Sequence, residues 1–342
     1  MTLTSPAAYV QRLDECLEDG ASWLPDSFKA LHRRYILSSM TKSGGFAGAL
    51  GDADFYYTAF GLRCAALLGI QDGLFWARTA NWLKTIEFPA NSLIDVFSVL
   101  VADRLIGSHS VPPPDDPIRA ALRQSATAAL DSQDASVRLD GQDAADGFYS
   151  AFISLMSRGV LNQTLPRLDE MRRFVLERVR SETKLAKLPG MKHLVRGLAN
   201  VPEIKRLRGL AAGVSQVAAA VAVLSASGGV PKDLIHPLSD YIISLQRNDG
   251  GVAAHPDAPM SDCLSTFTAL VAALDITGSP VAPVGLRPGF RLGDMARFIL
   301  SLADNNGGFR GVESGAAPDV EYTFYGIGTL SQIGRASCRE RM

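Results

Sequence analysis

The chain has 342 residues, of which 47% are hydrophobic and 20% charged, a composition typical of a globular protein with a sizeable core. Its 34 basic and 35 acidic residues nearly cancel, so the charge balance gives no electrostatic case for nucleic acid as the partner. The four cysteines show neither metal-knuckle nor disulfide-framework spacing, which fits a reducing compartment.

The chain opens with a predicted helical segment over residues 1–34. This segment has no apolar stretch of signal-peptide length, so we expect a cytoplasmic protein. Farther along, residues 209–230 carry no charge over a length that is sufficient to span a membrane. Because this stretch is mostly Ala, Gly and Ser, with Gln216 near its middle, we expect a buried core helix and no transmembrane segment.

One pattern recurs three times, at residues 35–46, 241–252 and 298–309. Each copy is an apolar helical stretch that leads into Gly-Gly, and each is followed by an Asp four residues before a Thr: Asp54, Asp262 and Asp319. A Gly pair suits a helix end where the backbone needs positive φ. An Asp before Thr is typical of a helix start, because its carboxylate accepts from free backbone N–H groups. Each unit is therefore predicted to be a helix, a glycine turn, a polar loop and a capped second helix.

Weaker copies fill the intervals between the clear ones. One spans residues 82–106 with Asp95 at the expected second-helix start, another spans 118–156 with Asp146, and a third opens at Phe174. Counting all copies gives six units, and six helix pairs can close into a double ring that has no exposed ends. The sequence thus predicts an all-α fold, an (α/α)6 toroid built from helical hairpins, over residues 35–332.

Three segments fall outside this register. Residues 108–117 form a proline-rich loop, and residues 184–208 form an insertion with a strong positive bias. Residues 333–342 look like the translation of a sequencing adaptor, so we expect them to be an artefact outside the native fold.

The repeats resemble the prenyltransferase and squalene-oxidase repeat family, which includes the β subunits of protein farnesyl- and geranylgeranyltransferases and the class II terpene cyclases. The best passages are residues 307–311 with 319–331 and residues 43–48 with 54–68, and they look most like geranylgeranyltransferase β subunits. The resemblance implies a toroid whose aromatic central cavity holds an isoprenoid chain. It further implies that second-helix aromatics point inward, namely Tyr57, Phe60, Tyr149, Phe152, Phe267, Tyr322 and Tyr325. The alternative is that these rings simply fill a core, because pocket and core have similar linings.

The resemblance also implies a zinc site. In protein prenyltransferases zinc activates the acceptor thiol and is held by an Asp, a Cys two residues later and a His in the last repeat; zinc lowers a thiol's pKa without redox chemistry. Here Asp262 falls on the metal Asp, Leu264 on the Cys position with Cys263 beside it, and Tyr322 on the His position. Asp262 and Cys263 are therefore the candidate metal ligands. The alternative is that Asp262 caps a helix, as the Asp of the other two copies does.

The diphosphate-binding residues differ as well. His255 stands where the family has an Arg, and the family's nearby Lys has no counterpart. Cations are needed there because charge builds up on the departing diphosphate. The basic insertion 184–208 could supply them, or it could be a solvated face.

Three functions stay open, and the sequence names no catalytic residue. The first is a prenyltransferase β-subunit-like enzyme that transfers a prenyl group from a diphosphate to a nucleophile, with a separate helical partner subunit. The second is a catalytically reduced toroid that binds a lipid or a protein. The third is a terpene cyclase, although Tyr56 and Tyr57 stand where the cyclase motif has its second and third acids. The expected ligand is an isoprenoid diphosphate or another lipid.

Overall fold

The computed structural model describes residues 5–48, 51–86, 92–109, 116–136, 144–186, 213–277, 289–315 and 317–339. Within these ranges it contains thirteen α-helices and a single two-stranded sheet. Six helices form an inner ring: α3 (Phe55–Leu67), α5 (Leu93–His109), α7 (Ala144–Val160), α11 (Val214–Ala226), α13 (Cys263–Thr277) and α15 (Val320–Arg339). Six more lie outside them: α2 (Asp26–Ser39), α4 (Gly73–Thr85), α6 (Pro117–Ser136), α8 (Leu168–Ala186), α12 (Lys232–Ser244) and α14 (Leu292–Ser301).

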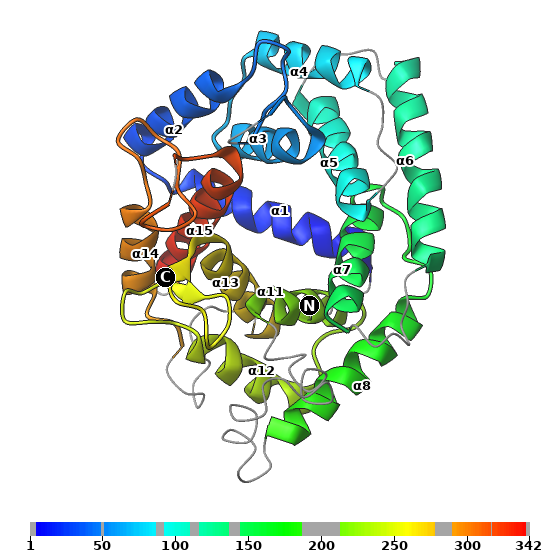
Figure 1. Ribbon diagram of the computed structural model, residues 1–342, viewed down its shortest axis with the longest axis vertical. Coiled ribbons are helices and arrows are strands. Elements are labelled where there is room, and N and C mark those ends of the chain that lie inside the picture. Colours follow the sequence, from blue (N-terminus) through cyan, green and yellow to red (C-terminus); the bar gives the residue numbers. More distant parts are fainter. Residues whose placement is uncertain are drawn as a thin grey trace.

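The inner helices close on themselves. Each packs against the next in chain order, and the last of them, α15, packs back against α3 (Figure 1). Every outer helix contacts at least one inner helix, so the apolar faces of both layers are buried between them. The predicted all-α toroid of paired helices is confirmed.

The remaining helix, α1 (Pro6–Ser22), lies across the centre of the ring (Figure 1). It packs tightly on the C-terminal parts of inner helices: Gly159 of α7 approaches Val10 and Gly20 of α1 approaches Ser331 of α15, each with no room for a side chain. Sequence analysis placed residues 1–34 before the toroid. The structure instead has α1 within the ring and begins the first outer helix at Asp26.

The three clear repeats build the same joint between an outer and an inner helix. Each capping Asp carboxylate accepts from the backbone N–H three residues later, at 2.8 Å for Asp54, 2.7 Å for Asp262 and 2.9 Å for Asp319. The predicted Asp caps are therefore confirmed. The Thr that follows has a second role: its hydroxyl oxygen accepts from the buried residue after Gly-Gly, in the pairs Thr58 with Phe46, Thr266 with Val252 and Thr323 with Phe309, at 2.9–3.0 Å.

The Gly pair does not end the outer helix, contrary to expectation. The helices α2, α12 and α14 end at Ser39, Ser244 and Ser301, several residues before the glycines. Gly44, Gly250 and Gly307 instead close a turn with φ of 105°, 94° and 93°, each donating its N–H to the carbonyl three residues earlier. In the second of these copies the turn leads into β1 (Val252–Ala253), which pairs with β2 (Ser261–Asp262) just before α13.

Several predicted segments lie partly or wholly outside the described residues. They include most of the proline-rich loop and the basic insertion from residue 187 onward. The uncharged stretch 209–230 contains α11, and among the helices of the described ranges none combines the length and apolarity needed to cross a membrane. The helix α15 continues past Gln332, where Arg335 donates to Asp19 of α1 at 2.9 Å.

Candidate functional site

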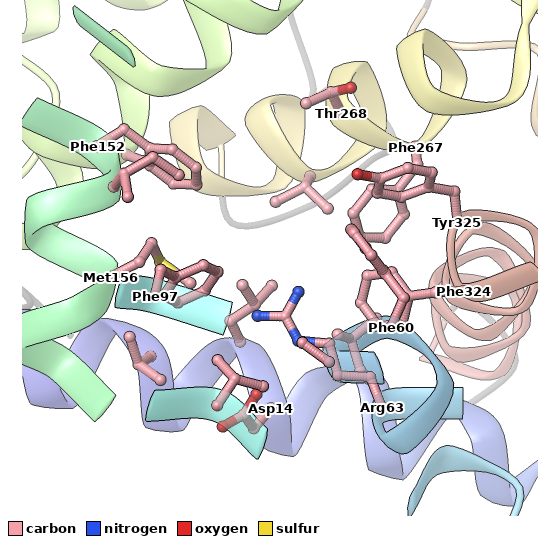
Figure 2. Close-up of a pocket in the computed structure, with 18 of the residues that line it drawn as sticks. Asp14, Phe60, Arg63, Phe97, Phe152, Met156, Phe267, Thr268, Phe324 and Tyr325 are labelled. Carbon is pink, nitrogen blue, oxygen red and sulfur yellow. The ribbon is translucent and has the colours of Figure 1, made fainter. Parts of the chain in front are cut away.

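A cavity of about 270 Å³ lies inside the inner ring. Its lining comes from α1 and from all six inner helices, and most of it is apolar. Aromatic rings dominate the part shown in Figure 2: Phe60, Phe97, Phe152, Phe267, Phe324 and Tyr325. The helix α11 adds small side chains, Ser215, Ala218, Ala219 and Ala222. An apolar, ring-lined hollow of this kind suits a hydrocarbon ligand.

The rings on α3, α13 and α15 hold one another in place. Phe60 lies 5.5 Å from Phe324 and 5.4 Å from Tyr325, centroid to centroid, and Phe267 lies 5.6 Å and 5.3 Å from the same two rings. These tilted and edge-to-face arrangements are the favoured geometries of aromatic pairs. This wall of the cavity is therefore formed before any ligand enters.

The structure brings together five of the aromatic residues expected from the sequence: Phe60, Tyr149, Phe152, Phe267 and Tyr325 all line the cavity. Tyr57 and Tyr322 are not among the lining residues. Their rings cover loop glycines instead, since a Cβ on Gly48 would lie 2.5 Å from Tyr57 Cε2 and one on Gly311 would lie 2.5 Å from Tyr322 Cζ. A step of one residue turns a helical side chain by about 100°, which separates these two tyrosines from the inward face.

The inward face begins one residue earlier, two positions after the capping Asp. Tyr56, Leu264 and Glu321 occupy that position in the three clear repeats, and all three line the cavity. The Tyr56 hydroxyl donates to Glu321 Oε1 at 2.6 Å and thereby joins α3 to α15. Tyr56 and Glu321 were not predicted, although the repeat register contains the signal.

The Tyr56–Glu321 pair places an ionisable carboxyl, that of Glu321, on the wall of a mostly apolar cavity. Burial raises the pKa of Glu321 above its ordinary value, while hydrogen bonds from the Tyr56 and Tyr325 hydroxyls act in the opposite direction. Burial also raises the pKa of Tyr56, so its hydroxyl keeps its proton and remains a donor. A raised pKa makes a buried carboxylate a better proton acceptor than an ordinary one.

Three more lining residues were missed by sequence reasoning. Phe324 stands five residues after Asp319, as Phe267 stands five after Asp262, so the repeat register could have revealed it. Phe97 stands two residues after Asp95 of a weak copy, the same position as Tyr56 and Glu321, so the register could have revealed it too. Arg63 is a cation on α3 that has no counterpart in the other clear repeats, where the same position is Val271 and Gly328.

The candidate metal ligands have other roles. Asp262 uses one carboxylate oxygen for Ser265 N–H at 2.7 Å and the other for Ser265 Oγ at 2.7 Å, as a helix cap. Cys263 is buried with its thiol 3.5 Å from the Tyr322 carbonyl oxygen, and burial raises its pKa well above the ordinary value, which opposes the thiolate that zinc needs. Within the described part of the chain no three His, Cys, Asp or Glu residues are grouped so as to hold a metal ion. As arranged here, these residues do not fit a zinc site, and zinc stays an expectation of the resemblance.

His255 is exposed on the loop between β1 and β2 and is not among the cavity-lining residues. Its backbone carbonyl accepts from Ala258 N–H at 3.0 Å, which closes a turn of that loop. Its expected contact with a diphosphate stays a prediction.

Comparison with known proteins gives one match. The model of the prenyltransferase alpha-alpha toroid domain matches residues 22–98 and 206–338, more than half of the chain. The two matched segments contain the three clear repeats. No curated protein matches, and no solved structure matches.

Proposed function

The chain belongs to the prenyltransferase alpha-alpha toroid family, and we propose that its central cavity binds the hydrocarbon chain of an isoprenoid diphosphate. The observation that supports this most directly is the aromatic wall formed by Phe60, Phe267, Phe324 and Tyr325. An isoprenoid presents methyl groups and double bonds along its length, and contact with fixed rings removes this apolar surface from water at about 25 cal/mol per Å². The geranylgeranyl chain is our first choice of ligand, because the repeats look most like geranylgeranyltransferase β subunits.

We further propose that the bound diphosphate is a prenyl donor. In the transfer, the bond between the prenyl C1 and the diphosphate oxygen breaks, the acceptor's nucleophilic atom bonds to C1, and the diphosphate leaves. Glu321 is our candidate for the base that takes the proton from the acceptor. Its carboxylate faces the cavity, and the Tyr56 hydroxyl holds it at 2.6 Å. A raised pKa brings a carboxylate closer to the range in which general bases work best.

The second candidate is a toroid that binds an isoprenoid without transferring it. The engaged oxygens of Asp262 and the buried Cys263 thiol favour this candidate, because the family's thiol-activating residues are not available in this arrangement. Both candidates require the same cavity, so binding and turnover must be measured separately.

Binding is tested by isothermal titration calorimetry with geranylgeranyl diphosphate, and the isolated chain is sufficient because the whole lining is its own. We expect a Kd of tens of micromolar or tighter. Ala218→Phe places a ring into the cavity from α11 and should weaken binding at least tenfold. The matched control is Ala128→Phe on the exposed surface of α6, which should bind normally. Undetectable binding to the wild-type protein, or equal effects of the two variants, would refute the proposal.

Turnover is tested by incubating the protein and radiolabelled geranylgeranyl diphosphate with thiol and alcohol acceptors, followed by separation of the products. Transfer is expected to fall in Glu321→Gln while binding is retained, because the amide cannot accept the proton. Binding without any product would assign the chain to the second candidate. Cyclic hydrocarbons among the products would indicate terpene cyclisation instead.

A further inference from the structure

Arg63 places a cation on the aromatic wall of a mostly apolar cavity. It lies on α3 one turn after Phe60, and Figure 2 shows its guanidinium pointing into the hollow. Its Cζ atom is 5.0 Å from the ring centroid of Phe97, 5.2 Å from that of Phe324 and 5.6 Å from that of Phe60. Three rings at these distances give cation–π stabilisation, but a ring face accepts no full hydrogen bond from the guanidinium.

Arg63 makes neither a hydrogen bond nor an ion pair with any residue of the described ranges. Among the acids that line the α1 side of the cavity, Asp14 pairs with Arg104, Asp275 pairs with Arg12 and the Tyr9 hydroxyl, and Glu18 is exposed. The fully buried arginines Arg119 and Arg158 are paired, with Asp103 at 2.6 Å and with Asp134 at 2.7 Å. Arg63 is half-buried at the cavity wall and has no such partner in the described part of the chain.

An unpaired cation in an apolar hollow is costly. A charge removed from water loses hydration that only a counter-charge or full hydrogen bonding replaces. Burial lowers the pKa of Arg63 below its ordinary value, while the negative charge of Asp14 acts in the opposite direction. The repeat does not require it, because Val271 and Gly328 stand at this position in the other clear copies. Its five donors are therefore available to something that enters the cavity.

The position of Arg63 also says where in the cavity an anion would be stable. Arg63 follows Tyr56 by seven residues, which is about 10 Å along the helix axis. The end marked by Tyr56 carries the acids Glu321, Asp319 and Asp262, which repel a second anion. Attraction by the Arg63 guanidinium therefore favours an anionic group on the α3 wall, away from the Tyr56–Glu321 pair.

We propose that Arg63 binds the anionic end group of the cavity ligand, a carboxylate or a phosphate, so that the cavity takes an anionic amphiphile with its charge held between Phe60, Phe97 and Phe324. The inference shares one premise with the proposed function, namely that the ligand occupies this cavity. It adds the orientation and the charge of the ligand. It also names a residue away from the loop that contains His255, where the resemblance places the diphosphate.

The test compares the binding of charged and neutral ligands that have hydrocarbon chains of equal length. One probe pair is geranylgeranyl diphosphate with geranylgeraniol, and the other is decanoate with decanol. Each probe is titrated calorimetrically into the wild type and into Arg63→Met, Arg63→Lys and the matched control Arg297→Met, whose side chain is exposed on α14. A charge-assisted contact predicts that the wild type prefers the anionic member of a pair by about tenfold to a hundredfold. Arg63→Met should abolish the preference, Arg63→Lys should keep part of it, and Arg297→Met should keep all of it.

Each outcome has one meaning. Decanoate preference alone identifies a carboxylate ligand and overturns the isoprenoid proposal while supporting the role of Arg63. Preference for the diphosphate alone identifies a phosphate group as the anion and supports isoprenoid binding and the role of Arg63, but it counts against Glu321 as the base, because the prenyl C1 would then lie beside Arg63. Equal binding of charged and neutral probes, or a preference that survives Arg63→Met, overturns the role of Arg63 and leaves the isoprenoid proposal standing. Failure of every probe to bind overturns both.

The ligand-free protein provides an independent measurement. If Arg63 is unpaired, Arg63→Met removes a half-buried charge and should raise the melting temperature, whereas loss of a hidden ion pair would lower it. A lower melting temperature would therefore overturn the inference even if the binding data were favourable.

Discussion

Two contacts in the joints between helices predict a specific stability coupling. Phe46 is fully buried and lies against Gly61 of α3, and Phe309 lies against Gly326 of α15 in the same way. In the remaining clear repeat the same two positions are Val252 and Ala269. A large residue opposite glycine is thus replaced by a smaller residue opposite alanine. The variants Phe46→Val and Gly61→Ala should therefore destabilise the protein singly and compensate each other when combined.

The magnitude follows from the distances. A Cβ on Gly61 would lie 2.6 Å from Phe46 Cδ2, whereas carbon atoms pack at about 3.5–4.0 Å. Overpacking of this kind costs about 1–3 kcal/mol, and the helix propensity of Ala over Gly returns close to 1 kcal/mol. Phe46→Val leaves space and should cost about 2–3 kcal/mol, somewhat less than a Phe→Ala change. In the double variant the new methyl group enters that space, so we expect a coupling energy of about 1–2 kcal/mol.

The assay is urea unfolding of the wild type, both single variants and the double variant, with the slope of the free energy against urea checked for constancy. The control cycle pairs Phe46→Val with Gly73→Ala, since a Cβ on exposed Gly73 of α4 meets no atom within 4 Å. The control pair should be additive to about 0.5 kcal/mol. If the free-energy changes of Phe46→Val and Gly61→Ala simply add, the side chains at these two positions do not compensate each other in size, and the prediction is refuted.

Three further changes test the joints and the cavity. His32 accepts from Gly308 N–H through Nδ1 at 2.9 Å, and burial lowers its pKa to about 4. Its contribution to the unfolding free energy is therefore present above pH 6.5 and is lost as the pH falls toward 4. In urea titrations at different pH, the wild type should lose roughly 3 kcal/mol over this range relative to His32→Asn. Thr266→Val leaves the buried Val252 N–H without its acceptor and should cost about 1–3 kcal/mol in thermal unfolding. Burial raises the pKa of Glu321, so the stability of the wild type relative to Glu321→Gln should fall as pH rises above 4.5.

Controls for these changes come from the same chain. Thr127→Val removes a hydroxyl on α6 that donates only to its own helix and should be close to neutral, so an equal loss in Thr266→Val would contradict the role of the joint. Parallel pH profiles of the wild type and His32→Asn would show that His32 is not buried in its neutral form. A Glu321→Gln profile that falls with pH relative to the wild type would refute only the slope assigned to Glu321.

The ring of paired helices could be predicted because each clear repeat contains local sequence signals for its helix boundaries. An Asp that caps a helix and a Thr four residues later recur with identical spacing, and the structure uses both in every clear copy. The Gly pair was assigned to the wrong element for a physical reason. Positive φ is equally useful at a helix end and in a turn, and the sequence does not distinguish the two.

The site was predicted less well because its register was taken from the resemblance instead of from the repeats. The resemblance implied that the second-helix aromatics Tyr57 and Tyr322 point into the cavity, and Tyr322 also falls on the family's His position. Yet each of these rings covers a glycine two residues after the buried Phe, Gly311 and Gly48. In the remaining copy Ser265 replaces the tyrosine and Ala254 replaces the glycine. Tyrosine and glycine therefore occur together in two repeats and are both absent from the third, which indicates that the tyrosine packs on the loop glycine.

Comparison of the copies also shows why Arg63 and Glu321 stand out. Positions that build the joint are the same or compensate in volume across the three repeats: the capping Asp, the Thr, and the pair formed by Phe46 and Gly61. Positions that face the cavity carry different residues in the three repeats. One such position is Tyr56, Leu264 or Glu321, and another is Arg63, valine or glycine. A residue that architecture does not constrain and that costs stability where it stands needs another reason to be there. For the half-buried guanidinium of Arg63 and the carboxyl of Glu321, we propose that this reason is a ligand whose charge and protons they handle.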